Sequence, residues 1–197
     1  MDHGDFAGQY GLVEKWDTCM ADCIMHIPCM IYATGLPRGV KVNSLTSHVD
    51  LAPTILDIMQ IEHFAGIHGK SLLPVIYGKG SVRDAVFADG GHEEEMLKRY
   101  SVELLNRSSR RDAKQETYCR YPDTMARTKM VRTDRYKLVM RLKGGNELYD
   151  IKDDPYEMNN LWGDPAYNSV VMKHMQKMIE WCIETDTDRP YQPIVGA

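Results

Sequence analysis

The feature that most restricts the fold is a regular alternation of apolar and polar residues between residues 125 and 150. The stretch MVRTDRYKLVMRLKGGNELYDI carries turn residues at 133–135 and again at 144–146. Successive side chains of a β-strand point to opposite faces of a sheet, so a period of two residues is typical of strands with one buried face. The two turns therefore predict three short antiparallel strands in this part of the chain.

Upstream of these strands, the chain alternates between expected strands and helices. The apolar run IPCMIYA at 27–33 predicts a buried strand, and DAVFADGG at 84–91 predicts a strand that ends at a double glycine. Residues 1–90 are typical of strands and helices from the edge of a larger sheet. We therefore expect an α/β fold that ends in an antiparallel segment.

Two helices are expected where apolar residues recur at helical spacing. The first starts near Asp50, where either Asp50 or Thr54 can cap it, and Asp50 is interpreted as the cap. Its apolar face consists of Leu51, Ile55, Ile58 and Met59. The second runs from about 165 to 184, and its methionine-rich apolar face is interpreted as core. That face consists of Val171, Met175, Met178, Ile179 and Cys182.

Composition argues against several classes of function. The net charge of −4 argues against a nucleic-acid surface. No window approaches the roughly 20 apolar residues that a membrane span needs. The start has no basic and apolar leader pattern, so no signal peptide is expected. The compartment is unknown, and is expected to be cytoplasmic if Met1 is the true start.

The five cysteines form an odd set without a tight framework, and are interpreted as reduced thiols. The alternative is a zinc site at Cys19, Cys23 and His26, although a fourth ligand is not evident in the sequence.

Charge is dense from 92 to 123, where we expect an exposed helix followed by a loop. This segment is either a solvated face or a lid that faces substrate. The cluster Arg107, Arg110, Arg111 and Lys114 is either solvated or a contact for an anionic sugar.

Candidate metal ligands stand at the start of the chain, in the sequence DHGD. Asp2 and His3 can bind one metal only if the backbone bends sharply, because adjacent side chains of a strand point apart, and Gly4 permits such a bend. The competing interpretation is an exposed turn. Lys15 lies twelve residues after His3, and by itself it is equally an exposed lysine.

Seven stretches, taken in order, resemble the C-terminal half of the sulfatase family, which belongs to the alkaline-phosphatase superfamily. They are DHGD with GQYGLVEKW, HIPCMIYATG, SHVDLAPTILDI, GIHGKSLLPVIYG, RDAVFADGG, TKMVRTDRYKLVMR and NELYDIKDDPYEMNNLW, and they cover most of residues 2–162. The most diagnostic are DHG with its later lysine, VDLAPTILD and ELYDIKDDPYEMNNL. The resemblance implies a partial alkaline-phosphatase-like sheet with helices at 1–123. A small antiparallel sheet packed on a C-terminal helix follows at 124–197.

The resemblance also implies roles for individual residues. In sulfatases a metal, usually Ca²⁺, is held by an aspartate pair from the N-terminal half and by a later pair, Asp followed by Asn or His. Here the later pair is Asp2 and His3, and Lys15 corresponds to the lysine that contacts the sulfate. His68 and His92 are candidates for shaping the substrate pocket.

One part of the family pattern is missing from the chain. The sulfatase nucleophile is a Cys or Ser in the motif C/S-x-P-x-R, converted to formylglycine, and no cysteine or serine here fits it. The first aspartate pair is missing too. We therefore expect the chain to begin inside a catalytic domain, to hold Ca²⁺ weakly, and to hydrolyse no sulfate ester alone. Unpaired strands predict association with a missing N-terminal half or with a second copy.

Three functions remain open from the sequence. The first is the C-terminal portion of a metal-dependent sulfatase that acts on a sulfate-ester small molecule or a sulfated glycan, with a phosphoester or phosphonate hydrolase as its variant. The second is a non-catalytic relic that binds an anionic glycan or oligomerises. The third is an unrelated metal-binding or regulatory domain.

Overall fold

The centre of the molecule is one antiparallel sheet. The computed structural model describes residues 2–98 and 113–186. The sheet has the order β3–β4–β5–β6. Its strands are β3 (Val86–Gly90), β4 (Thr128–Arg132), β5 (Tyr136–Arg141) and β6 (Glu147–Asp150). The three strands and two turns expected between 125 and 150 are therefore confirmed.

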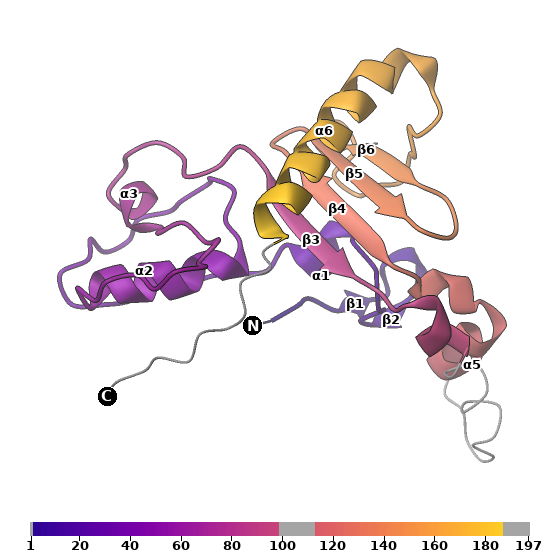
Figure 1. Ribbon diagram of the computed structural model, residues 1–197, viewed down its shortest axis with the longest axis horizontal. Coiled ribbons are helices and arrows are strands. Elements are labelled where there is room, and N and C mark those ends of the chain that lie inside the picture. The colour runs from indigo at the N-terminus through magenta and orange to yellow at the C-terminus, as the bar shows by residue number, and fades with distance from the viewer. Residues whose placement is uncertain (1, 99–112, 187–197) are drawn as a thin grey trace.

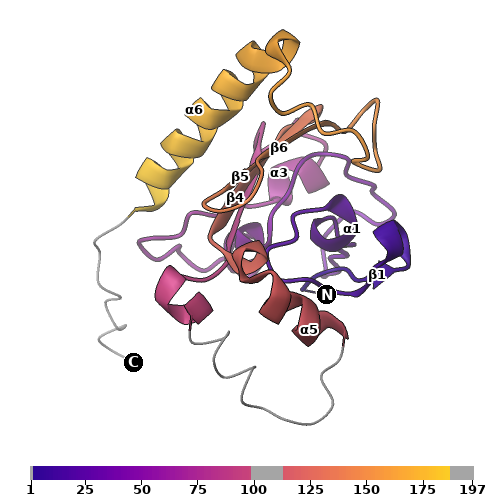
Figure 2. The same ribbon diagram turned by 90° about the vertical axis from the view of Figure 1, so that its right-hand side faces the viewer.

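Each face of the sheet is covered by a different part of the chain. Helix α6 (Asn168–Thr185) lies across one face (Figure 1). The segment with β1 and α1 lies on the other side, as Figure 2 shows with the sheet nearly edge-on. Strand alternation divides the side chains between these layers.

The core follows the same division. Val131, Leu138 and Leu148 are 0% exposed and pack with Met178 of α6. On the opposite face, Met20 packs with Met130 and Val139. The methionine stripe of α6 is thus core in part, because Met178 is buried and Met175 packs against it, whereas Ile179 is 57% exposed.

The N-terminal segment has little regular structure of its own. It contains a hairpin of β1 (Phe6–Ala7) and β2 (Val13–Glu14), joined through a 3-10 turn at Gln9–Gly11, and then α1 (Asp22–Met25). The hairpin forms a sheet separate from β3–β6. The segment must therefore be held to the larger sheet by side chains rather than by a strand ladder.

A lobe set to one side of the sheet contains a 3-10 turn at His48–Asp50, α2 (Leu51–Ile58) and α3 (Leu73–Ile76) (Figure 1). Asp50 is 0% exposed. Its carboxylate accepts from Ser47 N at 2.8 Å and from Lys70 N at 2.8 Å, and it pairs with Arg83. Asp50 stands at the N-cap position of α2, as expected, but makes no side-chain cap hydrogen bond to that helix. Its carboxylate instead completes the capping box of the 3-10 turn with Ser47 and ties three segments together.

One expectation for the segment before this lobe is wrong, and one for the lobe itself is wrong in part. Residues 27–33 form no strand and are largely exposed, with Met30 at 95% and Tyr32 at 79%. In the described part of the chain no strand lies beside this run to pair with it. The expected apolar face of α2 is confirmed only in part: Leu51 and Ile58 are half-buried, whereas Ile55 and Met59 are exposed. The fully buried side chains of α2 are Pro53 and the polar Thr54.

The charged segment contains more helix than expected. Residues 94–98 are helical, in agreement with the expected exposed helix. Helix α5 (Ala113–Arg120) and a 3-10 turn at Pro122–Met125 then occupy a stretch expected to be loop. Another 3-10 turn, Pro165–Tyr167, leads into α6.

The expected strand at 84–91 is confirmed as β3, but it pairs antiparallel with β4 rather than in a separate larger sheet. The sheet thus spans both sides of the domain boundary expected at 123/124, and that boundary stays a prediction. Among the helices of the described residues, none has the length and apolar character needed to cross a membrane.

Candidate metal and anion site

A hairpin brings together the three residues expected to form the site. Phe6 pairs with Glu14 in the β1–β2 ladder, so the chain returns past its own start. Gly8 and Gly11 adopt φ values of +105° and +73° in the turn, a region that favours glycine. As a result, Lys15 Nζ lies 2.8 Å from His3 Nε2.

Contacts at both ring nitrogens orient the side chain of His3. Nδ1 lies 2.8 Å from Gly4 O, a carbonyl that can only accept, so Nδ1 carries the proton. Nε2 then presents its lone pair and accepts from the Lys15 ammonium. Asp2 Oδ2 lies 3.5 Å from the same Nε2, and the side chain of Asp2 is 88% exposed. A hydrogen bond from its own backbone N–H is the main cause that lowers the pKa of Asp2, and the positive charge of Lys15 lowers it further.

The donor set of Asp2 and His3 fits one divalent cation. Two ligand atoms that each lie about 2.4 Å from a Ca²⁺ ion are about 3.5 Å apart when they occupy adjacent positions. Asp2 Oδ2 and His3 Nε2 have that separation. Over residues 2–98 and 113–186, no group of three or more His, Cys, Asp or Glu side chains is placed to hold a metal. A full shell would therefore need water or ligands from elsewhere.

Gly4 is required for close backbone packing as well as for the expected bend. Its N–H donates to Ile24 O at 2.8 Å, and a Cβ at this position would lie 2.0 Å from Cys23 O. Only glycine lets the site segment lie this close to the backbone of α1. The position of His3 therefore depends on the position of α1.

Helix α5 supports the other side of the site, which the sequence did not reveal. Trp16 packs edge-to-face on Tyr118 with ring centroids 5.4 Å apart, and Asp17 N donates to Tyr118 Oη at 2.8 Å. Lys114 donates to the carbonyl of Lys15. Burial raises the pKa of Tyr118 to about 12, so this hydroxyl stays protonated. The helix-forming run AKQE at the start of α5 was the available signal.

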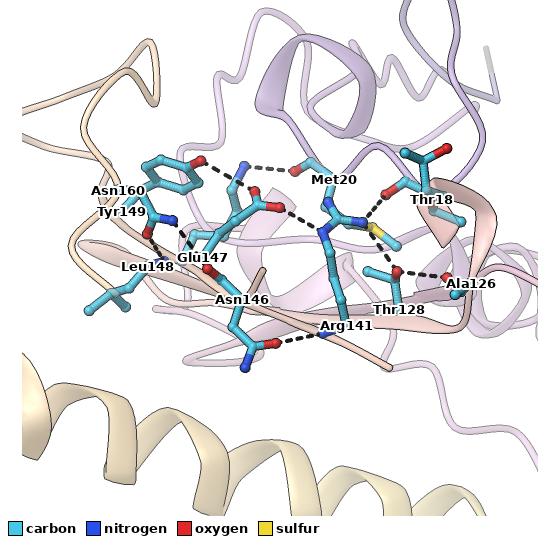
Figure 3. A network of polar contacts seen from close by, with 12 residues as sticks. Thr18, Met20, Ala126, Thr128, Arg141, Asn146, Glu147, Leu148, Tyr149 and Asn160 are labelled. Carbon is cyan, nitrogen blue, oxygen red and sulfur yellow. Dashed lines mark hydrogen bonds and ion pairs between the residues drawn. The ribbon is translucent and has the colours of Figure 1, made fainter. Parts of the chain in front are cut away.

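The sheet holds the segment that follows Lys15. Arg141 donates from Nε to Glu147 Oε1 at 2.7 Å and from Nη1 to Thr18 O at 3.2 Å (Figure 3). The same Nη1 lies 3.2 Å from Thr128 Oγ1. These contacts connect β4, β5 and β6 to the backbone three residues beyond Lys15.

The two other histidines lie in different places. His92 donates its N–H to Met125 O at 2.8 Å, and Met125 belongs to the same apolar cluster as Trp16, on the site's side of the sheet. His68 is exposed in the connection from α2 to α3, and that lobe lies well away from β1 and β2 (Figure 1). His68 therefore belongs to a different lobe from the hairpin of the candidate site, and the substrate roles of both histidines stay predictions.

The cysteines and the basic cluster are the remaining candidate residues. All five cysteines are free, and burial raises the pKa of Cys19 and of Cys23, which keeps both as thiols at neutral pH. Of the basic cluster, Lys114 is at the site, whereas Arg107, Arg110 and Arg111 lie outside the described residues.

Comparisons with known proteins identify the family and the fold of the chain. The family of C-terminal domains of N-sulphoglucosamine sulphohydrolase matches residues 88–184. The N-acetylglucosamine-6-O-sulfatase of Bacteroides thetaiotaomicron is 29% identical over 184 residues, which are 91% of this chain and 28% of that protein. The solved structure of a 2-O GAG sulfatase superposes with a TM-score of 0.72 at 26% identity, over 94% of this chain and 35% of that one. A phosphonate monoester hydrolase of Agrobacterium radiobacter shares the fold, with a TM-score of 0.52 at 24% identity over 73% of this chain and 26% of that one.

The fold is thus that of an alkaline-phosphatase-like hydrolase. The chain belongs to the sulfatase family of the alkaline-phosphatase superfamily and corresponds to the C-terminal portion of its members. It spans about a third of the length of these relatives.

Proposed function

We propose that this chain is the C-terminal portion of a metal-dependent sulfuric-ester hydrolase. In this proposal Asp2 and His3 are metal ligands, and Lys15 contacts a sulfate oxygen. The observation that carries it is the convergence of these three side chains on one point, with Lys15 Nζ at 2.8 Å and Asp2 Oδ2 at 3.5 Å from His3 Nε2. That convergence occurs in a chain of the sulfatase family.

The chemistry of the residues supports these roles. A divalent cation, usually Ca²⁺ in the family, would supply positive charge against the sulfate oxygens. Asp2 offers a carboxylate with a lowered pKa, so it is ionised at neutral pH. The Lys15 ammonium has three donors and no acceptor, which suits an anionic oxygen. In this structure one of these donors is used by His3 Nε2, so Lys15 and a cation compete for a single lone pair.

The substrate class and the partner follow from the relatives. Both named sulfatases act, by their names, on sulfate esters of amino sugars or glycosaminoglycans. We propose a sulfated glycan as substrate. The chain contains no C/S-x-P-x-R motif, so the nucleophile comes from the N-terminal portion of a sulfatase, and this chain alone hydrolyses no sulfate ester.

The experiment is an NMR titration of the chain with inorganic sulfate in the presence of Ca²⁺. We expect the Lys15 side-chain signals to shift with saturation, and Lys15→Met and Asp2→Asn to abolish sulfate binding. Asp134→Asn, in the β4–β5 turn, is the matched control and should behave like the wild type. The proposal would be contradicted if sulfate caused no shift of the Lys15 signals in the wild-type chain. It would also be contradicted if the Asp2→Asn chain bound sulfate with the affinity of the wild type.

A phosphoester or phosphonate hydrolase is the second candidate, and His3 favours it. Imidazole nitrogen suits transition ions such as Zn²⁺ better than Ca²⁺, which prefers oxygen ligands. The shared fold of a phosphonate monoester hydrolase is compatible with this candidate. Repeating the titration with inorganic phosphate and Zn²⁺ distinguishes the two candidates. Tighter binding of sulfate with Ca²⁺ identifies a sulfatase, and tighter binding of phosphate with Zn²⁺ identifies a phosphoester or phosphonate hydrolase.

A further inference from the structure

A buried group of charges lies between the sheet and the N-terminal segment, apart from the candidate site. Lys137 of β5 is 0% exposed. Its Nζ donates to Met20 O at 2.7 Å and to Asp22 Oδ1 at 3.0 Å, and it pairs with Glu157. Arg132 Nη2 lies 3.2 Å from Asp22 Oδ2, so two cations and two carboxylates form one cluster.

The cluster holds the first turn of α1 directly. Glu157 Oε2 accepts from the backbone N–H of Asp22, the first residue of α1, at 2.7 Å. The side chain of Asp22 is held at both oxygens by Lys137 and Arg132. Both the backbone and the side chain of the helix start are therefore fixed to the sheet and to the segment around Glu157.

Helix α1 in turn holds the residue that follows His3. Gly4 N donates to Ile24 O at 2.8 Å, and the approach of Gly4 to Cys23 O leaves no room for a Cβ. His3 Nδ1 bonds the carbonyl of this same Gly4. A continuous set of contacts thus runs from the charge cluster through α1 and Gly4 to the ring of His3.

A second contact ties the hairpin turn to the same segment. Tyr10 Oη donates to Tyr156 O at 2.6 Å, one residue before Glu157. Glu157 has a left-handed backbone with φ +55°, which is uncommon for a residue with a side chain. The DPYEMNNL motif therefore contacts both α1 and the hairpin that carries Lys15.

We propose that Glu157, Lys137 and Asp22 are positioning residues for the candidate site. They act through α1 and Gly4 to set the orientation and the tautomer of His3, and hence its contact with Lys15. The inference rests on the proposed function of Asp2, His3 and Lys15 as a metal and sulfate site. It gives the DPYEMNNL motif a role at the site, in addition to its contact with β6, where Leu148 N donates to Asn160 Oδ1 at 3.0 Å.

The test is NMR of the whole chain carrying Glu157→Gln, which keeps the side-chain volume and removes the charge. We expect hydrogen exchange of the Gly4 amide to accelerate at least tenfold, the Nδ1–H tautomer of His3 to lose population, and the NOE between the His3 ring and the Lys15 side chain to weaken. Amides of β4 and β5 should lose much less protection than the Gly4 amide. Arg132→Gln, which removes only one side of the cluster, should give the same changes at smaller amplitude.

The matched control is Asp153→Asn, which removes a more exposed ion pair with Arg135 from the same region. It should leave Gly4 and His3 unchanged. Wild-type exchange at Gly4 with a wild-type His3 tautomer in a folded Glu157→Gln chain would overturn the proposal. An equal loss of protection at Gly4 and throughout β4 and β5 would overturn it too, because it would show a general role in stability.

Failure of the positioning proposal can be distinguished from failure of the proposed function. If Glu157→Gln releases His3 but the wild-type chain binds neither cation nor sulfate, the positioning stands and the proposed function fails. If the wild-type chain binds a cation through His3 but Glu157→Gln leaves Gly4 and His3 unchanged, the positioning fails and the proposed function stands.

Discussion

Substitution of Lys137 by methionine is expected to cause a large loss of stability. Methionine keeps most of the volume but removes the ammonium that compensates Glu157, whose side chain is 4% exposed, and Asp22, at 17%. Removing one partner of a buried ion pair costs roughly 3–5 kcal/mol, because it leaves an uncompensated charge. Arg127→Gln breaks ion pairs with Glu93 and Asp89 that are exposed at both ends, and it should cost about 0–1 kcal/mol.

The measurement is urea unfolding followed by circular dichroism, with Arg127→Gln as control. Glu157→Gln added to Lys137→Met should restore part of the loss, because it removes the charge that had lost its partner. The double variant should therefore be less destabilised than the sum of the two single variants. A Lys137→Met chain within about 1 kcal/mol of the wild type, with no coupling to Glu157→Gln, would refute the reasoning.

Three further predictions concern other parts of the fold. Asp50→Ala should lower the free energy of unfolding by about 3 kcal/mol, because it leaves Arg83 unpaired in a buried position; a change like that of an exposed Asp→Ala in urea unfolding would contradict this. Burial lowers the pKa of His174, so the folded state favours the neutral ring, and stability should fall as pH drops below the ordinary value of 6.5. His174→Gln should flatten that part of the stability–pH curve, and an unchanged slope would argue against it. The exposed run with Met30 and Tyr32 should make the chain self-associate in sedimentation velocity, less so in Met30→Asp/Tyr32→Asp, and a wild-type monomer at every concentration would count against this.

The C-terminal sheet was predictable because the alternating residues and turns that determine it are close together in the sequence. Alternation places Val131 and Leu138 on one face and Val139 on the other, and all three are 0% exposed. Turn residues at 133–135 and 144–146 set the register without any distant partner. The meeting of His3 and Lys15 was also within reach, since a short glycine-containing hairpin separates them.

The rest depended on contacts that are distant in sequence. Lys137 has the position of a polar-face residue in the alternating pattern, yet it is fully buried because Asp22 and Glu157 reach it from other segments. The run at 27–33 has the composition of a buried strand, but composition does not supply the neighbouring strand that burial needs. Helix α5 was missed because its apolar contacts, such as Tyr118 on Trp16, join residues a hundred positions apart.

The central claim is that Asp2 and His3 form a cation site at which Lys15 competes, and a titration with Mn²⁺ as a paramagnetic probe tests it most directly. The His63–Asp57 pair, with Nε2 and Oδ1 2.8 Å apart and more exposed than the ring of His3, is an internal control in the same chain. The account predicts that the ring signals of His3 broaden before those of His63, that Asp2→Asn abolishes this preference, and that Lys15→Met strengthens it. Equal broadening of both histidines, unchanged by Asp2→Asn, would contradict the account.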